Sequence, residues 1–185
     1  MKITEKIVCD FIENGVIKQE EYALYYYCFD VVFSQLFFCI VLLSISLILH
    51  QVEVTIAYYI GFSVIRYTSG GYHAKSQRRC FWLSILNYMF CLGLINIIPR
   101  TMYPGFLFGT LLIDFFLIWK FAPVDHPNKR FSLQEVYCYR KRSRVAISGI
   151  MLSIFFLWKL MPLFSLAFVV GCMSATISVV VAKKQ

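Results

Sequence analysis

Long apolar runs, separated by short polar segments, are the feature that most restricts the fold of this chain. An α-helix needs about 20 mostly apolar residues to cross a bilayer, and several runs approach that length. Of the 185 residues, 59% are hydrophobic and only 15% are charged, whereas soluble domains are typically about 25% charged. A soluble protein of this size could not bury so much apolar surface. The sequence therefore predicts an all-α integral membrane protein.

Six membrane-spanning helices are predicted within a single domain that covers residues 1–185. The expected spans are Val31–Leu49, Val54–Tyr67, Phe81–Ile98, Tyr103–Trp119, Val145–Leu157 and Leu163–Ala182. The second and fifth are short in apolar length, so they extend into the interface or lie where the bilayer thins. All 18 lysines and arginines except Arg100 and Lys159 fall on the same side as the two termini. Because basic segments stay in the cytoplasm, both termini are expected there.

The N-terminal segment predicts an amphipathic helix on the inner leaflet, before the first span. Apolar residues recur at helical spacing at Ile3, Ile7, Val8, Phe11 and Ile12. The pair Asn14-Gly15 is a plausible helix stop. Such a helix anchors the protein to membrane lipids or packs against the bundle. The alternative is that it helps a membrane-bound substrate to dock.

The net charge of +8 and the seven cysteines indicate neither a nucleic-acid-binding protein nor a disulfide scaffold. Membrane topology accounts for most of the basic excess, and the rest suits anionic lipid or an acidic partner. Cys28, Cys39, Cys91 and Cys172 lie in or beside apolar runs, where cysteine behaves as a small hydrophobic residue. One His and one Cys cannot complete a structural zinc site, which needs four ligands. We therefore expect no metal or other cofactor.

The polar segment RYTSGGYHAKSQRRC, from Arg66 to Cys80, carries a candidate catalytic pair between two apolar runs. Cys80 is the candidate nucleophile, because the thiolate is the reactive form and the neighbouring basic residues favour that anion. His73 is the candidate base, which takes the thiol proton and later returns it to the leaving amine. Gly70-Gly71 gives the chain freedom just before His73, and backbone N–H groups there could bind an oxyanion.

The spacing of the pair imposes a geometric condition. Seven residues along a straight helix would separate His73 from Cys80 by about 10.5 Å, whereas a hydrogen bond needs roughly 3 Å. If the pair acts together, residues 73–80 therefore cannot be one straight helix. The alternative is that the pair is incidental, with the histidine at the membrane interface and the cysteine at the start of the third span. The basic residues alone satisfy the topology rule.

Asp114 falls inside the predicted fourth span, about two turns from its cytoplasmic end. A carboxylate inside the membrane is energetically costly and usually has a partner. Asp114 is expected to form a structural ion pair with Arg66 or Lys120, or else to orient the candidate histidine. Two asparagines of the third span, Asn87 and Asn96, are expected to hydrogen-bond between helices.

Two segments resemble the accessory gene regulator B (AgrB) family, the membrane peptidases of peptide quorum sensing. The family pattern is an Arg at the end of a span, then Gly-Gly-x-His-Ala, then a Cys seven residues after the His. Here the matching residues are Arg66, Gly70-Gly71-Tyr72-His73-Ala74 and Cys80. The segment APVDHPNKRF, from Ala122 to Phe131, is similar to the family's Ala-Pro-Val segment, which opens a basic loop. Chain length, the six-span pattern and the N-terminal segment also agree with the family.

The resemblance implies a cysteine endopeptidase that removes the acidic C-terminal tail of an AgrD-like propeptide and leaves a cyclic thiolactone or lactone. Cys80 would be its nucleophile and His73 its general acid and base, while Arg66 would hold the site together or support charge. The resemblance also implies a homodimer.

Charge alone suggests which residues attract the acidic tail. The candidates are the basic residues of the loop after the fourth span, among them Lys129, Arg130 and Arg140. Two competing classes remain. A small transporter or scaffold would use Asp114 and the basic loop, and a thiol acyltransferase would share the nucleophile but cleave no peptide.

Overall fold

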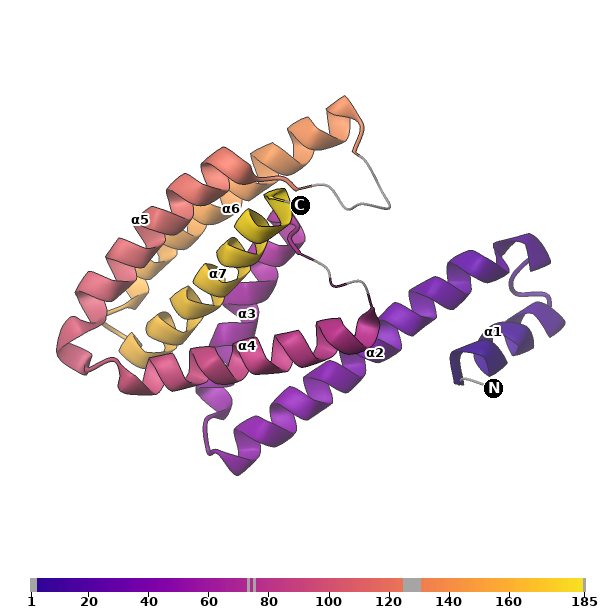
Figure 1. The fold of residues 1–185 in the computed structure, drawn as a ribbon, viewed down its shortest axis with the longest axis horizontal. Helices are drawn as coiled ribbons and strands as arrows, with labels where there is room; N and C mark the ends of the chain where they lie inside the picture. The colour runs from indigo at the N-terminus through magenta and orange to yellow at the C-terminus, as the bar shows by residue number, and fades with distance from the viewer. Residues whose placement is uncertain (1–2, 73, 75, 125–130, 185) are drawn as a thin grey trace. The chain divides into compact units, whose positions relative to one another are not determined.

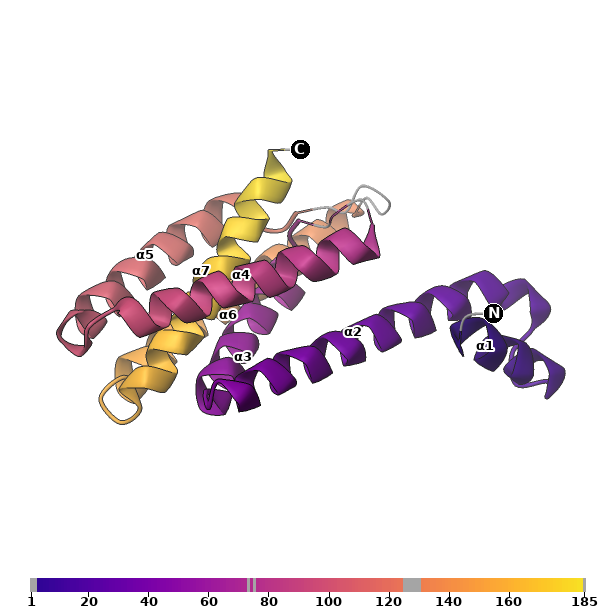
Figure 2. The same ribbon diagram turned by 60° about the horizontal axis from the view of Figure 1, so that its bottom comes forward.

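The computed structural model describes residues 3–72, 74, 76–124 and 131–184. These residues form helices and short connections, with no β-strand among them, so the all-α prediction is confirmed. The chain divides into two compact units, Met1–Ile45 and Ser46–Gln185. Figures 1 and 2 trace both units in two views.

The first unit contains an N-terminal helix packed on the start of a long one. Its elements are α1 (Ile3–Glu13), the short 3-10 helix η1 (Gln19–Glu21) and most of α2 (Tyr22–Ile48). Val8 of α1 is fully buried. The Phe11 ring meets Phe29 of α2 edge-on, with the ring centroids 5.8 Å apart. The apolar face of α1 thus contacts α2, which agrees with the predicted amphipathic helix.

The first helix ends at the predicted stop. The Asn14 side-chain amide donates a hydrogen bond to the Asp10 carbonyl at 2.8 Å. Gly15 follows with a φ of 70°, a backbone conformation that glycine adopts without steric cost.

The second unit is a helical bundle built around its last helix. Its elements are α3 (Val52–Ser69), α4 (Gln77–Ile97), the short η2 (Arg100–Met102), α5 (Tyr103–Phe121), α6 (Leu133–Leu157) and α7 (Pro162–Lys183). Helix α7 packs most extensively on α3 and also contacts α4, α5 and α6. In both views α4 crosses α7 at a steep angle (Figures 1 and 2). The C-terminal ends of α3, α5 and α7 lie at the same end of the bundle (Figure 1).

Small residues let α3 and α7 approach each other closely. A Cβ on Gly61 of α3 would collide with the backbone carbonyl of Phe168, and a Cβ on Gly171 of α7 would collide with that of Tyr58. The Cys172 thiol donates a hydrogen bond to the Gly61 carbonyl at 3.5 Å. Helices in membranes associate through such close packing because lipid removes most of the hydrophobic driving force between them.

Hydrogen bonds between helices involve both asparagines of α4, as predicted. The Asn87 amide donates to the Tyr58 hydroxyl at 2.8 Å and to the Ser174 hydroxyl at 2.6 Å. It therefore joins α4 to α3 and α7. Asn96 exchanges side-chain hydrogen bonds with Gln51 at 3.0 and 3.2 Å. These bonds orient α4, whose first turn carries the candidate nucleophile.

Four helical segments are long and apolar enough to cross a membrane. They are Gln19–Ile48, Gln77–Ile97, Arg100–Phe121 and Pro162–Lys183, which correspond to the first, third, fourth and sixth predicted spans. Within the described residues, α3 and α6 do not meet that measure of length and composition. The six-span count and the cytoplasmic location of both termini therefore stay predictions.

Helix α6 begins well before the predicted fifth span. It starts at Leu133 rather than Val145, so basic residues expected in a loop lie in its first turns. The reason is a capping box: the Glu135 N–H donates to the Ser132 hydroxyl at 3.3 Å, and the Ser132 N–H donates to the Glu135 carboxylate at 2.8 Å. This exchange satisfies backbone donors that a helix start leaves without partners.

Candidate active site

Arg66 organises the motif segment at the end of α3, where its side chain is half-buried. Its Nη1 donates to the Ser178 hydroxyl of α7 at 2.7 Å. Its Nη2 donates to the backbone carbonyl of Tyr72. The guanidinium therefore ties together the end of α3, the loop that follows it and the last turns of α7. The expected role of Arg66 in holding the catalytic site together stays a prediction.

The two glycines allow the loop to turn across this guanidinium. Gly70 has a φ of 78° and Gly71 a φ of 143°, and both values strain any other residue. A Cβ on Gly70 would lie 2.7 Å from the Val124 carbonyl oxygen. A Cβ on Gly71 would meet Nη1 of Arg66 and lie 2.8 Å from the Ser178 hydroxyl. Backbone conformation thus favours glycine at both positions, and at Gly70 the Val124 backbone also leaves no space for a side chain.

The N–H groups of this loop are partly engaged. The Gly70 N–H donates to the Arg66 carbonyl at 3.1 Å, and the Tyr72 N–H donates to the Ser178 carbonyl at 3.0 Å. Neither is free to bind an oxyanion in this arrangement. The expected oxyanion role of the glycine pair stays a prediction, and it concerns the Gly71 N–H rather than that of Gly70.

The two segments that carry the family resemblance lie against each other. The Val124 N–H donates to the Ser69 carbonyl at 3.1 Å, which joins the Ala-Pro-Val segment after α5 to the end of α3. Next to this bond, the Ser143 hydroxyl of α6 donates to the Thr68 carbonyl at 2.7 Å. The end of α3 is therefore held by α6 and by the segment that follows α5, and the loop after α3 is held by α7.

Cys80 lies in the first turn of α4. Ser76 caps this helix, because its hydroxyl accepts the Arg79 N–H at 3.4 Å, and the Cys80 N–H donates to the Ser76 carbonyl at 3.0 Å. The side chain is half-buried. The start of a helix carries partial positive charge, which favours an anion such as a thiolate. The Arg66 guanidinium also lies within electrostatic reach of the Cys80 thiol.

The described residues meet the geometric condition on the candidate pair, because those between α3 and α4 are not helical. Helix α3 ends at Ser69 and α4 begins at Gln77, so residues 73–80 are not one continuous helix. His73 itself lies outside the described residues, and so do Lys129 and Arg130. The expected roles of these three side chains therefore stay predictions.

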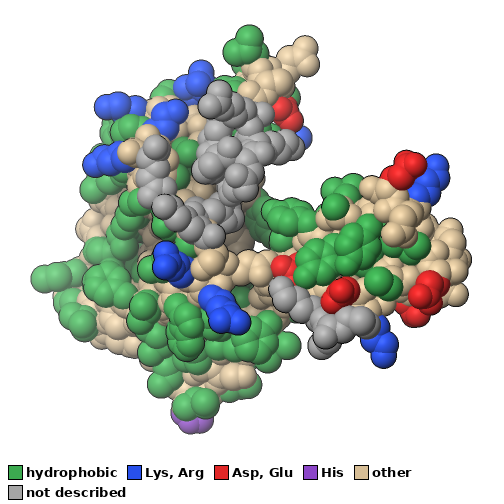
Figure 3. Space-filling view, turned by 45° about the vertical axis from the view of Figure 1, so that its right-hand side comes forward, with side chains coloured by type: hydrophobic (Ala, Val, Ile, Leu, Met, Phe, Trp, Pro, Cys, Tyr) green, Lys and Arg blue, Asp and Glu red, His purple; other side chains and the backbone are tan. Residues whose placement is uncertain are grey.

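Several basic residues of α5 and α6 lie at one end of the bundle. Lys120 at the end of α5 and Arg140 in α6 are both exposed. Two neighbours on α6 pack over aromatic rings: Arg142 lies 5.6 Å from the ring centroid of Tyr139, and Arg144 lies 4.3 Å from that of Trp119. Figure 3 shows a group of basic side chains at this end, with hydrophobic side chains over much of the rest of the second unit. Such a charged rim suits anionic lipid headgroups or an acidic peptide.

Asp114 is buried inside the bundle and only 1% exposed. It lies beside the Thr176 hydroxyl of α7 and near Cys172. Its Oδ2 has no hydrogen-bond partner among the described residues. The expected ion pair with Arg66 or Lys120 is absent from that part of the chain. A role in orienting the histidine stays a prediction.

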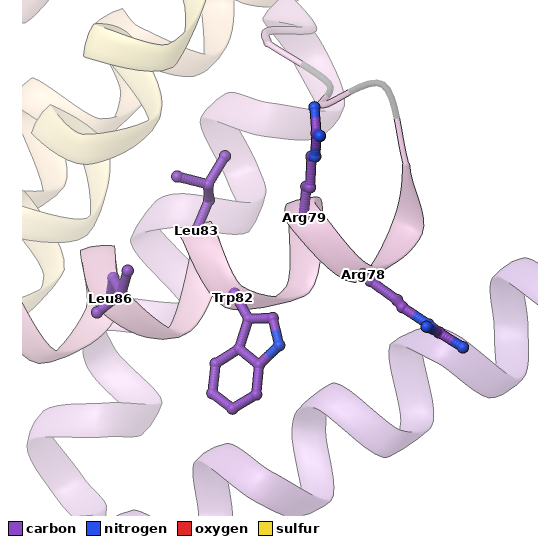
Figure 4. Close-up of a pocket in the computed structure, with 5 residues that line it drawn as sticks. All are labelled: Arg78, Arg79, Trp82, Leu83 and Leu86. Carbon is purple, nitrogen blue, oxygen red and sulfur yellow. The ribbon is translucent and has the colours of Figure 1, made fainter.

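One face of α4 next to Cys80 combines arginines with apolar side chains. A shallow pocket there is lined by Arg78, Arg79, Trp82, Leu83 and Leu86. Figure 4 shows the two arginines pointing away from each other at the start of the helix, with the tryptophan and leucines along the next turns. A chain segment lying along this face would reach the first turn of α4, where Cys80 lies.

The sequence interpretation did not identify Ser178 and Ser143. Both lie far along the chain from the residues that they contact. A signal for Ser178 was nevertheless present, because Ser174, Thr176 and Ser178 interrupt an otherwise apolar span. Polar side chains in a membrane helix usually face other helices rather than lipid.

A family model described as accessory gene regulator B matches residues 2–180. The chain belongs to the accessory gene regulator B family. No curated protein and no solved structure matches the chain significantly. Members of this family take part in processing the AgrD propeptide in quorum sensing. Family membership and the four apolar helices together make this chain a membrane protein of that processing type.

Proposed function

We propose that this chain is a membrane cysteine endopeptidase that removes the C-terminal tail of an AgrD-like propeptide and promotes cyclisation of the remainder. The observation that carries this proposal is the position of Cys80. It is a half-buried thiol in the capped first turn of α4, directly after the loop of the family motif. The Arg66 guanidinium lies within electrostatic reach of this thiol.

In the first step, His73 accepts the proton of the Cys80 thiol. The thiolate then attacks the carbonyl carbon that precedes the tail. The carbon–nitrogen bond breaks as His73 returns the proton to the departing amine, and the acyl group is left on Cys80 as a thioester. This step consumes no water, and the tail leaves with a free amino group.

In the second step, the thiol or hydroxyl of a Cys or Ser within the propeptide attacks the thioester. Its proton passes to His73 and from there to the Cys80 sulfur, which leaves as a thiol. The product is a cyclic thiolactone or lactone. Exchange of one acyl bond for another keeps the carbonyl activated, so ring closure needs no ATP. A site beside the bilayer favours this route because it limits the access of competing water.

The acidic tail of the substrate would be attracted by the basic residues near the site. Lys129, Arg130 and the exposed Arg140 are the candidates, and exposed charges of this kind contribute modest, salt-sensitive attraction. Anionic lipids would compete for the same charges. We include a homodimer in the proposal as an expectation from the family resemblance alone.

The deciding experiment is co-expression of the chain with an AgrD-like propeptide that carries an acidic C-terminal tail. We expect cleavage by the native protein and none by Cys80→Ala or His73→Ala. A variant with Cys28, Cys39, Cys91 and Cys172 replaced by Ala is the control and should stay active. Cleavage by Cys80→Ala would show that another residue is the nucleophile.

A second experiment separates a cyclase from an ordinary protease. A propeptide whose ring-forming Cys is changed to Ala should still lose its tail but remain attached to Cys80. That adduct should survive denaturing electrophoresis, disappear with neutral hydroxylamine and never form on Cys80→Ala. Rapid release of a linear acid, with no adduct at any time, would refute cyclisation and leave only proteolysis.

A further inference from the structure

Ser178, near the end of α7, contacts the motif loop at three points. Its hydroxyl accepts a hydrogen bond from Arg66 Nη1 at 2.7 Å and another from the Tyr72 N–H at 3.0 Å. Its backbone carbonyl also accepts from the Tyr72 N–H at 3.0 Å. A single residue of the last helix therefore holds both ends of the segment from Arg66 to Tyr72.

The close fit of the loop depends on this serine. The Ser178 hydroxyl occupies the space beside Gly71, where a Cβ would lie only 2.8 Å away. A hydroxyl offers two acceptor lone pairs, and the two N–H donors use both of them. The bond from Arg66 is charge-assisted, which makes it stronger than a bond between neutral groups.

Both backbone polar groups of Tyr72 take part in hydrogen bonds. The Tyr72 carbonyl accepts from Arg66 Nη2, and the Tyr72 N–H donates to Ser178. The Tyr72 backbone is therefore held on both sides, by Ser178 of α7 through its N–H and by Arg66 through its carbonyl.

We propose that Ser178 is a positioning residue for His73, acting through Arg66 and Tyr72. The inference rests on the proposed function, because it gives His73 the role of general acid and base. Ser178 does not touch the reacting atoms. It holds the Tyr72 backbone directly before the proposed base, and a shift of about 1 Å in a catalytic group can lower a rate by as much as 100-fold.

The test compares Ser178→Ala and Ser178→Thr with a matched control on the same helix. Ser165→Ala removes a different hydroxyl of α7, which is fully buried and has no hydrogen-bond partner in the described part of the chain. Cleavage of an AgrD-like propeptide is measured in membranes over a range of substrate concentrations. Hydrogen exchange of the peptides covering residues 66–76 is measured in parallel, without substrate.

We expect Ser178→Ala to lower kcat by roughly 10- to 100-fold with little change in KM, because positioning acts on the chemical step. Ser178→Thr keeps the hydroxyl and should restore most of the rate. Exchange at residues 70–72 should rise roughly tenfold or more in the Ala variant, as expected for the loss of a charge-assisted hydrogen bond. Ser165→Ala should match the native protein in both measurements.

The possible failures can be told apart. Unchanged exchange at residues 70–72 in Ser178→Ala would overturn the inference whether or not the chain cleaves a peptide. Faster exchange with native kcat would show that Ser178 holds the loop without positioning the catalytic group, which also overturns it. A Cys80→Ala variant that still cleaves would instead refute the proposed function.

Discussion

Replacing Gly71 by Ala tests the loop geometry most directly. The backbone φ of 143° at this position strains any residue that carries a Cβ. The new methyl group would also meet Nη1 of Arg66 and lie 2.8 Å from the Ser178 hydroxyl. The Arg66 side chain is flexible enough to move aside, but in doing so it loses its 2.7 Å bond to Ser178.

Two contributions set the expected loss of stability. A non-glycine residue in such a backbone conformation costs about 1–3 kcal/mol. A lost hydrogen bond to a charged group costs about 1.5–3 kcal/mol. The sum lowers the free energy of unfolding by about 2.5–6 kcal/mol. That is a large fraction of the roughly 5–15 kcal/mol that stabilises a typical domain.

Two control glycines separate these contributions. Gly15 has a φ of 70° but nothing within 4 Å of the position that an added methyl group would take, so Gly15→Ala reports backbone strain alone, about 1–2 kcal/mol. Gly93 lies within helix α4 with open space around it, so Gly93→Ala should stabilise by about 0.5–1 kcal/mol. The assay is reversible unfolding of the full chain by SDS titration in mixed micelles. If Gly71→Ala proves no less stable than Gly15→Ala, the contact with Arg66 and Ser178 adds nothing and the reasoning fails.

Three further outcomes are expected. Gly171→Val should destabilise by about 1–3 kcal/mol or more in the same titration, because α7 would be pushed off the α3 backbone; native stability would contradict the close packing. Asp114→Asn should keep or raise stability, since an amide buries no charge, and a marked loss would indicate a partner for the carboxylate. In a cysteine-free background, single cysteines replacing Arg100 and Lys159 should react with an impermeant reagent on intact cells, whereas one replacing Lys75 should not; the reverse pattern would invert the topology.

The positions of the membrane-length helices could be predicted from the sequence because the apolar runs are long. Four of the six predicted spans correspond to helices of membrane length and composition. The start of α6 was predicted wrongly because hydropathy falls in its charged first turns. The signal there was local: Ser132 and Glu135 have the spacing of a capping box, which sets a helix start whatever the polarity of the residues that follow.

The site was predictable where the motif is continuous and unpredictable where it is assembled from separate helices. Cys80 and the break before it follow from one short stretch of sequence. The partner of Arg66 does not, because Ser178 is brought to it only by the packing of α7 on α3. For Asp114 the sequence suggested a basic partner because the side chain is charged. In the structure its neighbour on α7 is the Thr176 hydroxyl.

The pairing of α3 with α7 also affects how the protein is made. Helix α7 follows every other helix in the sequence, so a ribosome completes α3 long before its principal packing partner exists. Until then Gly61 has no α7 backbone against it, and Arg66 has no Ser178 to bind. The loop that leads into the active-site motif can be organised only once α7 has been inserted. A nascent chain that lacks α7 therefore cannot hold this loop through the Arg66 and Tyr72 contacts with Ser178.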